Sequence, residues 1–459
     1  MVSGDTIAAI ATAMSQSGIG IVRVSGENAI SIVNKIYRSK SGKKTLNHVE
    51  SHTIHYGYIY DEDEMVDEVM VMVMKGPRSY TAEDTVEIDC HGGVLVVRRI
   101  LETVIKNGAR CAQPGEFTKR AFLNGRIDLS KAEAVIDIIH SKNEFALKNS
   151  VNQLKGSVYE KIKDIREKII YEIAFIESAL DDPEHISLDG YNDEIEEKIV
   201  DLQKETKKLY ENAENGKMLK EGIKTVIVGK PNAGKSSLLN KLIGEERAIV
   251  TDIAGTTRDI LEETIFLNGL GLNIIDTAGI RTTEDIVEKI GVEKAKKYAN
   301  DADLIIYVVD ALVPLDANDE DIIQMILDKN VIVLLNKTDM HPVITEESLK
   351  ARLDKPVLSI SAKENIGIDI LEDTIKNMFF HGRINMNEEV FITNVRQKEA
   401  IGRADESLRM VLQSIRDGMP EDFYSIDLMS AYSSLGEVIG VEVGEDLVNK
   451  IFSDFCMGK

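Results

Sequence analysis

Hydrophobic residues recur at steps of three and four through the middle of the chain, which is the spacing of one face of an α-helix. One such face consists of Val158, Ile162, Ile165, Ile169, Ile173, Ile176 and Leu180. A second helix follows, with Ile195, Ile199, Leu202, Leu209 and Ala213 on its apolar face. The pattern therefore predicts two long amphipathic helices. Helical spacing returns after about Gly382.

The N-terminal part of the chain has a different pattern. Residues 51–60 and 66–74 are rich in β-branched, aromatic and alternating apolar residues, with acidic residues between them. Such runs, separated by a turn, are typical of paired strands. We expect residues 1–118 to form an α+β domain.

Between Gly222 and Met378 short apolar runs alternate with helical stretches. The runs include "KTVIVG", "LNIIDTAG", "ADLIIYVVD", "VIVLLNKTD" and "KPVLSISAK". This alternation predicts a parallel sheet that is covered by helices on both faces. The expected architecture is an α/β domain, residues 218–382, inserted into an all-helical domain that comprises residues 119–217 and 383–459.

Length and charge narrow the choice of partners. At 459 residues the chain should hold two to four domains, at about 150 residues each. The 78 acidic and 55 basic side chains give a formal net charge of -23. This sign is opposite to that of a protein that coats nucleic acid, and it disfavours adsorption to anionic membranes. A polyanionic partner must therefore meet a local basic patch or be presented by another subunit.

The cysteines and the N-terminal segment indicate the compartment. Cys90, Cys111 and Cys456 are odd in number and form no C-x-x-C pair, so they predict neither a disulfide framework nor a zinc site. The opening residues lack a basic segment, and no run approaches the roughly 18 apolar residues of a membrane span. We expect a cytoplasmic protein.

A phosphate-binding loop is predicted by "GKPNAGKSS", which places Gly229, Gly234, Lys235 and Ser236 in the pattern G-x-x-x-x-G-K-S. The segment follows a predicted strand and precedes a predicted helix, as a P-loop requires. Backbone amides of such a loop surround phosphate oxygens, the lysine reaches the β- and γ-phosphates, and the serine hydroxyl can bind magnesium. The predicted nucleotide contacts here are Asn232, Ala233, Gly234, Lys235, Ser236 and Ser237.

Three further motifs each end an apolar strand. They supply the predicted GTP-binding residues Asp276, Thr277, Ala278, Gly279, Asn336, Lys337, Asp339, Ser361 and Ala362. Ligands of open α/β sheets bind at the carboxyl ends of the strands, so these motifs should meet the P-loop. The Asp339 carboxylate can accept hydrogen bonds from N1 and the exocyclic amine of guanine, a donor pair that adenine lacks. The motifs therefore predict a Ras-like domain that binds and hydrolyses GTP.

The segment "TDIAGTTRD" lies between the P-loop and Asp276. Thr256 or Thr257 could close over magnesium and the γ-phosphate as part of a switch loop. Ile280 occupies the position at which Ras-type enzymes carry a glutamine that orients the attacking water. Hydrolysis must therefore obtain its water and its charge compensation from elsewhere.

The whole chain resembles the MnmE (TrmE) family of tRNA-modification GTPases. The resemblance rests on "DTIAAIAT", "GIGIVRVSG", "RSYTAEDTVEIDCHGG", "PGEFTKRAFLNGRIDLSKAEAVIDII" and the terminal "FCMGK". It implies an N-terminal folate-binding domain that dimerises, a split helical domain and an inserted G domain. The implied partner is the flavoprotein MnmG (GidA), in a heterotetramer. The implied reaction adds a carboxymethylaminomethyl or aminomethyl group to carbon 5 of the wobble uridine of certain tRNAs.

The resemblance also assigns site residues. Its tetrahydrofolate derivative, 5-formyl or 5,10-methylene, would contact Arg23, Glu87, Arg126 and Lys459. Arg126 stands where some members have lysine, which keeps the charge and changes its geometry. A potassium ion beside the phosphates would be held by Asn232 and by the loop residues Thr251, Ile253 and Thr256, and magnesium by Ser236 and Thr257. Glu288 falls on the position that orients water, and Cys456 is the second candidate catalytic residue.

Three other functions are compatible with parts of the pattern. One of them, a folate enzyme whose G domain is only regulatory, differs from the main expectation mostly in emphasis. Cys456 is fourth from the end, as a prenylation box requires, but Gly458 and Lys459 do not fit that box and the preceding segment is not polybasic. A ribosome-assembly GTPase switch would share the nucleotide motifs, although it would be expected to carry a basic RNA-binding domain or a second G domain. The potassium-activated tRNA-modification GTPase remains the leading expectation.

Overall fold

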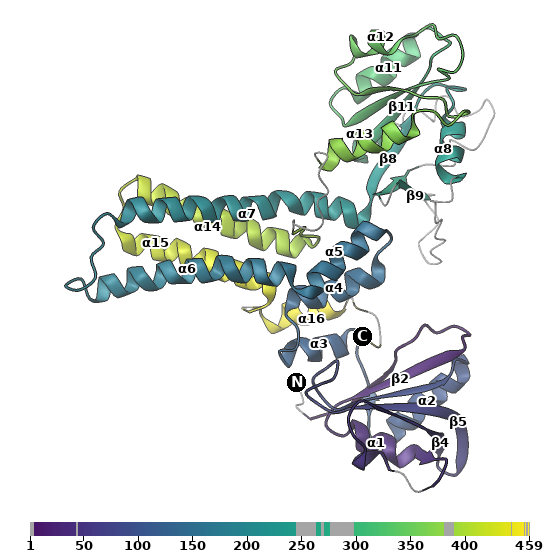
Figure 1. The fold of residues 1–459 in the computed structure, drawn as a ribbon, viewed down its shortest axis with the longest axis vertical. Coiled ribbons are helices and arrows are strands. Elements are labelled where there is room, and N and C mark those ends of the chain that lie inside the picture. Colours follow the sequence, from purple (N-terminus) through teal and green to yellow (C-terminus); the bar gives the residue numbers. More distant parts are fainter. Residues whose placement is uncertain are drawn as a thin grey trace. The chain divides into compact units, whose positions relative to one another are not determined.

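The computed structural model describes residues 4–42, 45–244, 263–267, 270–275, 298–380, 390–441, 443–453, 455 and 458. It divides into two compact units. Figure 1 shows the helices and strands, coloured along the sequence. Unit 1 comprises Met1–Ile139, Gln153–Asp189 and Ser414–Lys459, and unit 2 comprises His140–Asn152 and Gly190–Gln413. The boundaries of the three domains expected from the sequence differ from the boundaries of these two units. The three-domain division stays a prediction.

Unit 1 contains a seven-stranded sheet of order β3-β4-β5-β6-β2-β1-β7. Its elements are β1 (Ile7–Ile10), β2 (Ile19–Ser25), α1 (Ala29–Ile36), β3 (Tyr37–Ser39), the 3-10 helix η1 (Leu46–His48), β4 (Thr53–Asp61), β5 (Glu64–Met74), β6 (Thr85–His91), α2 (Val94–Lys106) and β7 (Arg110–Cys111). The predicted pairing of residues 51–60 with 66–74 is confirmed as the antiparallel β4–β5 pair. One face of the sheet packs on α1 and α2 through a cluster of buried residues that includes Val22, Ile88, Val33 and Ile100.

The helices of unit 1 are α3 (Glu116–Leu123), α4 (Leu129–His140), α6 (Ser157–Asp181), α15 (Glu421–Ile439) and α16 (Glu445–Ser453). The predicted apolar face of α6 is buried from Val158 to Ile176. The prediction is wrong for Leu180, which is 44% exposed. Ala179 takes the buried position at this point, and α6 ends one residue after Leu180.

Unit 2 begins with helices α5 (Glu144–Lys155) and α7 (Tyr191–Glu221) and ends with α14 (Val395–Arg416). The α/β part between them consists of β8 (Ile223–Val228), α8 (Lys235–Gly244), β9 (Glu263–Leu267), β10 (Leu270–Ile274), β11 (Leu304–Asp310), α11 (Ala317–Ile326), β12 (Val331–Asn336), α12 (Glu346–Lys350), β13 (Val357–Ser359) and α13 (Ile368–Phe380). All five residues of the predicted apolar face of α7, from Ile195 to Ala213, are buried.

The six-stranded sheet of unit 2 has the order β13-β12-β11-β8-β10-β9. The five strands from β13 to β10 are parallel, as predicted, but the edge strand β9 runs antiparallel to β10. The expectation of a purely parallel sheet is therefore wrong at this edge, where the two residues 268–269 join β9 to β10 and leave no room for a crossover. Apolar residues of α8 and α13 cover one face, and those of α11 and α12 cover the other.

The parallel order explains why β8, β11 and β12 read as continuous apolar runs. β11 and β12 are buried on both faces along almost their whole length, and β8 is so from Thr225 to Val228, so apolar residues predominate on both sides of these strands. It also brings the carboxyl ends of these three adjacent strands to one edge of the sheet, where the loops after β8 and β12 can meet. Among the helices that the structure describes, none combines the length and the apolar character that a membrane span requires.

Candidate functional site

The loop between β8 and α8 has the backbone geometry of a phosphate cradle. Gly229 has φ of +150° and Gly234 has φ of +102°, values that side chains with a Cβ rarely adopt. A Cβ at Gly229 would overlap the Val308 carbonyl oxygen, and one at Gly234 would overlap the Asn336 amide. Only glycine fits at either position. The loop therefore packs tightly on its neighbours and opens into the first turn of α8.

Lys235 is the first residue of α8. Its Nζ donates to the carbonyl oxygens of Gly229, at 2.7 Å, and Lys230, at 2.8 Å. An ammonium has three donors, so these two contacts leave one for a phosphate oxygen. Burial lowers the pKa of Lys235, and a phosphate charge beside it would oppose that shift. Together with the N-terminal amides of α8, this lysine makes an anion site that fits the phosphates of a nucleotide.

Asn336 joins the P-loop to the two motifs that follow it in the sequence. Its Nδ2 donates to the Ala233 carbonyl oxygen at 2.9 Å, and its Oδ1 accepts from the Ala362 amide at 3.1 Å. Asn336 is only 3% exposed, so both bonds are shielded from water. One buried amide thus connects three segments predicted to contact GTP.

Lys337 and Asp339, the residues predicted to contact the guanine base, follow the carboxyl end of β12. Lys337 has φ of +67°, and its Nζ is 2.6 Å from Asp310 Oδ2. The Asp339 side chain is exposed beyond the end of β12, so its carboxylate is accessible to a base. Ser361 is buried and accepts a hydrogen bond from the Glu364 amide. The turn after β13 is thereby fixed.

The remaining predicted P-loop contacts are accessible. Asn232 is exposed and has φ of +63°, and Ser236 and Ser237 are exposed in the first turn of α8. Several other predicted site residues lie outside the described part of the chain. These are Thr251, Ile253, Thr256, Thr257, Asp276, Thr277, Ala278, Gly279, Glu288, Cys456 and Lys459, together with Ile280.

A second cluster lies in unit 1, on the face of the sheet opposite α1 and α2. Arg23 and Glu87 are cross-strand neighbours on β2 and β6, and Arg23 Nε is 2.7 Å from Glu87 Oε1. Arg23 Nη1 donates to the Gly458 carbonyl oxygen at 3.0 Å, although 435 positions separate the two residues. The Arg126 guanidinium lies 4.9 Å from the centre of the Tyr80 ring. Three of the four predicted folate contacts are thus linked, directly or through Tyr80, in one cluster.

Sequence reasoning missed three members of this cluster. The Arg23 guanidinium also lies 5.5 Å from the centre of the Tyr80 ring and 5.6 Å from that of Phe117. Asp89, two residues from Glu87 on the same face, has a buried Oδ1 with no hydrogen-bond partner in the described part of the chain. Burial, and then the charge of Glu87, raises the pKa of Asp89. The spacing of Glu87 and Asp89 on one strand was the available signal.

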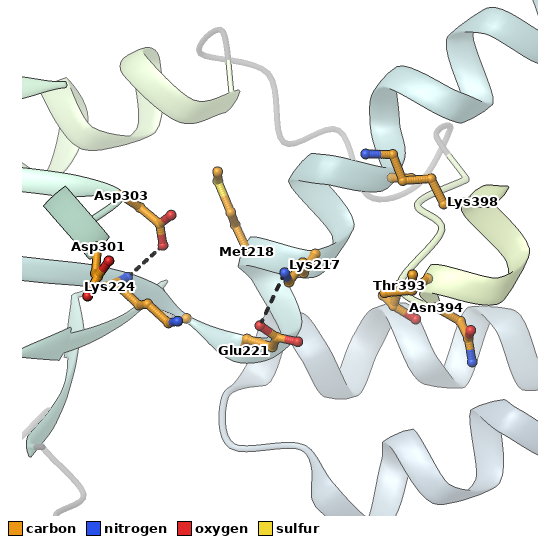
Figure 2. Close-up of a pocket in the computed structure, with 12 residues that line it drawn as sticks. Lys217, Met218, Glu221, Lys224, Asp301, Asp303, Thr393, Asn394 and Lys398 are labelled. Atoms are coloured by element: carbon orange, nitrogen blue, oxygen red, sulfur yellow. Dashed lines mark hydrogen bonds and ion pairs between the residues drawn. The ribbon is translucent and has the colours of Figure 1, made fainter. Parts of the chain in front are cut away.

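A separate pocket of about 350 Å³ lies within unit 2 at the amino ends of β8 and β11, away from the P-loop (Figure 2). Its lining includes Lys217 and Glu221 of α7, Lys224, Asp303 and Lys398. Positive and negative side chains are mixed there, and the Lys224 amide donates to Asp303 at 3.0 Å. No residue predicted from the sequence to bind a ligand lines this pocket.

Comparison with known proteins gives family-level matches over almost the whole chain. The family model described as MnmE helical domain matches residues 129–456, and that described as GTP-binding protein TrmE N-terminus matches residues 6–126. Among solved structures, the G domain of the T. maritima FeoB iron transporter is 28% identical and covers 34% of this chain and 98% of that chain. Its TM-score of 0.27 is too low to support an argument.

Two curated relatives, each covered to 99%, are named tRNA modification GTPase MnmE. The protein from Clostridioides difficile (strain 630) is 49% identical over 460 residues, which span 99% of this chain. The protein from Lachnoclostridium phytofermentans (strain ATCC 700394 / DSM 18823 / ISDg) is 60% identical over 455 residues, also 99% of this chain. Identity of this extent, joined to the P-loop geometry, shows that the chain belongs to the MnmE family of tRNA modification GTPases.

Proposed function

We propose that this chain is a potassium-activated GTP hydrolase that acts with the flavoprotein MnmG (GidA) on the wobble uridine, position 34, of certain tRNAs. It would add a carboxymethylaminomethyl or aminomethyl group to carbon 5, drawing on a one-carbon tetrahydrofolate unit. The observation that carries the folate part is the Arg23 cluster, in which Glu87, Tyr80 and the Gly458 carbonyl meet. GTP binding is supported by the orientation of Lys235 and by the Asn336 bridge.

In this proposal the P-loop and α8 bind the phosphates of GTP. Ser236 and Thr257 would hold magnesium, which would supply positive charge beside the phosphates. Asn232, Thr251, Ile253 and Thr256 would hold potassium, and Glu288 would orient the water. Asn232 and Ser236 are both exposed at the mouth of the P-loop, and this placement supports their roles as ligands.

The chemistry of the Arg23 cluster fits a folate. A pterin carries an amino group and a ring N–H, which suit carboxylate acceptors, and its glutamate tail suits cations and aromatic rings. Glu87 offers an acceptor, as does the buried Oδ1 of Asp89, for which the described residues supply no hydrogen-bond donor, whereas Arg23 and Arg126 offer positive charge. Lys459 follows Gly458 directly and would add another cation. We propose that these residues bind the 5-formyl or 5,10-methylene derivative.

Arg23→Ala is expected to weaken binding of 5-formyltetrahydrofolate about 10- to 100-fold, which corresponds to the loss of one charge-assisted hydrogen bond. GTP turnover should stay within about twofold, because Arg23 belongs to unit 1 and the P-loop to unit 2. Isothermal titration calorimetry measures the first quantity and phosphate release the second. Arg38→Ala is the matched control, since Arg38 is an exposed arginine stacked on Tyr60 in the same sheet. Equal folate affinity in both variants would contradict the assignment.

The proposed tRNA reaction is tested in cells. Total tRNA from a strain that lacks this gene should lose the wobble-uridine modification, as measured by nucleoside mass spectrometry, and the intact gene should restore it. We expect Cys456→Ser to restore less than about a tenth of the modification while the purified variant still hydrolyses GTP. Cys111→Ser, at an exposed cysteine of β7, is the control. Full restoration by Cys456→Ser would return that residue to a packing role, and unchanged tRNA in the deletion strain would refute the proposed reaction.

A homodimer is supported by the same face of the unit 1 sheet. Two adjacent rows cross four strands there: Ile54–Met72–Glu87–Arg23 and Tyr56–Met70–Asp89–Ile21. Ile54, Tyr56 and Met70 are large apolar side chains that remain exposed, which is typical of an interface. A second copy covering them would also shield the neighbouring Arg23 cluster. A molar mass of one chain by light scattering would contradict the dimer.

MnmG and tRNA are the proposed partners, in a heterotetramer with two copies of this chain, and the cytoplasm is the proposed location. The formal charge of -23 favours tRNA binding mainly by the partner protein, because the summed negative field of this chain repels tRNA. The partner would therefore present the tRNA or supply much of the positive surface.

A further inference from the structure

Lys230, the residue after the first P-loop glycine, forms ion pairs outside the loop. Its Nζ is 2.6 Å from Asp319 Oδ2 and 3.0 Å from Asp316 Oδ2. Asp316 is the N-cap of α11, and Asp319 is the third residue of that helix. The two aspartates also cap each other's backbone amides, so their positions are fixed by the start of α11. Lys230 is thus tied to the N-cap of a helix 86 positions further along the chain.

The acceptor side of this contact is buried. Asp319 is 1% exposed, and its Oδ1 accepts from the Tyr307 hydroxyl at 2.8 Å. Tyr307 is itself fully buried on β11, and burial, followed by its hydrogen bond to Asp319, raises its pKa. Burial disfavours the charged form of Lys230, but its hydrogen bonds to Asp319 and Asp316 outweigh this effect and raise its pKa. The Lys230 side chain is therefore charged at neutral pH, and its ion pairs with Asp316 and Asp319 fix its position.

The main chain of the same residue reaches the nucleotide site. The Lys230 carbonyl oxygen is one of the two acceptors that hold Lys235 Nζ. We propose that Lys230 is a positioning residue for GTP hydrolysis: its ion pairs with Asp316 and Asp319 fix the carbonyl that aims the Lys235 ammonium at the phosphates. The P-loop pattern itself leaves the residue type at this position open. The P-loop motif therefore does not require the ion pairs of Lys230 with Asp316 and Asp319.

The alternative is that these ion pairs only stabilise the fold. Removing Lys230 leaves the buried Asp319 carboxylate without its cation, which destabilises a protein whatever the catalytic role of the lysine. A double variant separates the two explanations. Lys230→Met with Asp319→Asn removes the uncompensated charge and keeps a hydrogen-bonding group for Tyr307. It should regain stability and leave the Lys230 carbonyl untethered.

The test compares full-length Lys230→Met, Lys230→Arg and the double variant with the parent chain. Steady-state phosphate release gives kcat and KM for GTP, and thermal unfolding gives stability. We expect kcat of Lys230→Met to fall about 10- to 100-fold at a temperature where the protein is folded, because a small displacement of a catalytic group has an effect of this size. Lys230→Arg should keep kcat within about threefold. The double variant should recover its unfolding temperature but not its kcat.

Lys350→Met is the matched control, because Lys350 also forms a 2.6 Å ion pair with a carboxylate, but on an exposed helix surface. Its kcat should equal that of the parent. The proposal is overturned if folded Lys230→Met turns over GTP at the parental kcat. It is also overturned if the double variant regains kcat together with stability, since the ion pair would then act on stability alone.

Discussion

Replacement of Asp339 by asparagine is expected to move the base preference of this GTPase from guanine to xanthine. The carboxylate matches two donors of guanine, and an amide places one donor where a carboxylate oxygen stood. Xanthine carries a carbonyl in place of the exocyclic amine and accepts that donor. Loss of two charge-assisted hydrogen bonds should weaken GDP binding by about 100-fold or more. Xanthosine diphosphate binding should strengthen.

Fluorescence titration with GDP and with xanthosine diphosphate measures the two affinities and so the change in base preference. The loop that presents Asp339 should keep its shape, because Asn336 and Lys337 hold it by contacts that do not involve the Asp339 side chain. Asp328→Asn is the control, since Asp328 is exposed in the connection before β12. Equal binding of ATP and GTP by the parent chain would contradict the assignment, as would an Asp339→Asn variant that still prefers GDP.

Hydrolysis should depend on potassium and on the pairing of two G domains. The position at which Ras-type enzymes carry the glutamine that orients water holds Ile280, so hydrolysis needs another means of orienting water and compensating charge. A monovalent cation beside the phosphates can supply this charge, and the exposed Asn232 offers a side-chain oxygen to hold it. We expect kcat in potassium to exceed kcat in sodium about 10-fold or more, because sodium is too small for the same oxygen cage.

The measurement is phosphate release at saturating GTP in potassium and in sodium at equal ionic strength. Asn232→Ala should lose most of the potassium activation, and Glu288→Ala should turn over slowly in both salts. Asn330→Ala is the control, since Asn330 is exposed before β12, at the edge of the sheet opposite the P-loop. Turnover per chain should rise with protein concentration if two G domains must meet. Equal rates for all these proteins in both salts would point instead to a group supplied by a partner.

The sequence was sufficient to predict most of the local structure. Apolar runs bounded by G-x-x-x-x-G-K-S and N-K-x-D identify β8 and β12, because strands buried on both faces cannot alternate in polarity. The antiparallel direction of β9 was missed, although the sequence carries a signal for it: Asn268-Gly269 between the two apolar runs is typical of a hairpin turn. Leu180 was misassigned because the helical period continues to the last turn of α6, whereas the burial ends at Ala179.

The sequence pattern alone does not predict which distant segments contact each other. The motifs predict that Asn336 lies near the nucleotide, but not that its amide bonds to Ala233 and Ala362 and so forms the support on which Gly234 must fit. Nothing in the spacing of Lys230, Asp316 and Asp319 indicates an ion pair. The folate positions came from family resemblance. The structure pairs Arg23 with Glu87 directly and links Arg23 to Arg126 through Tyr80, which no motif singled out.

The bond between Arg23 and the Gly458 carbonyl has a consequence for biosynthesis. At a translation rate of about 5 to 20 residues per second, the ribosome needs roughly 20 to 90 seconds to add the residues that separate them. The sheet of unit 1 is therefore made early, whereas α15 and α16 of the same unit follow only after the whole G domain has been synthesised. After α13 has been made and before α16 follows, the nascent chain carries an open Arg23 cluster and a complete nucleotide domain. GTP binding can thus precede maturation of the Arg23 cluster on the same polypeptide.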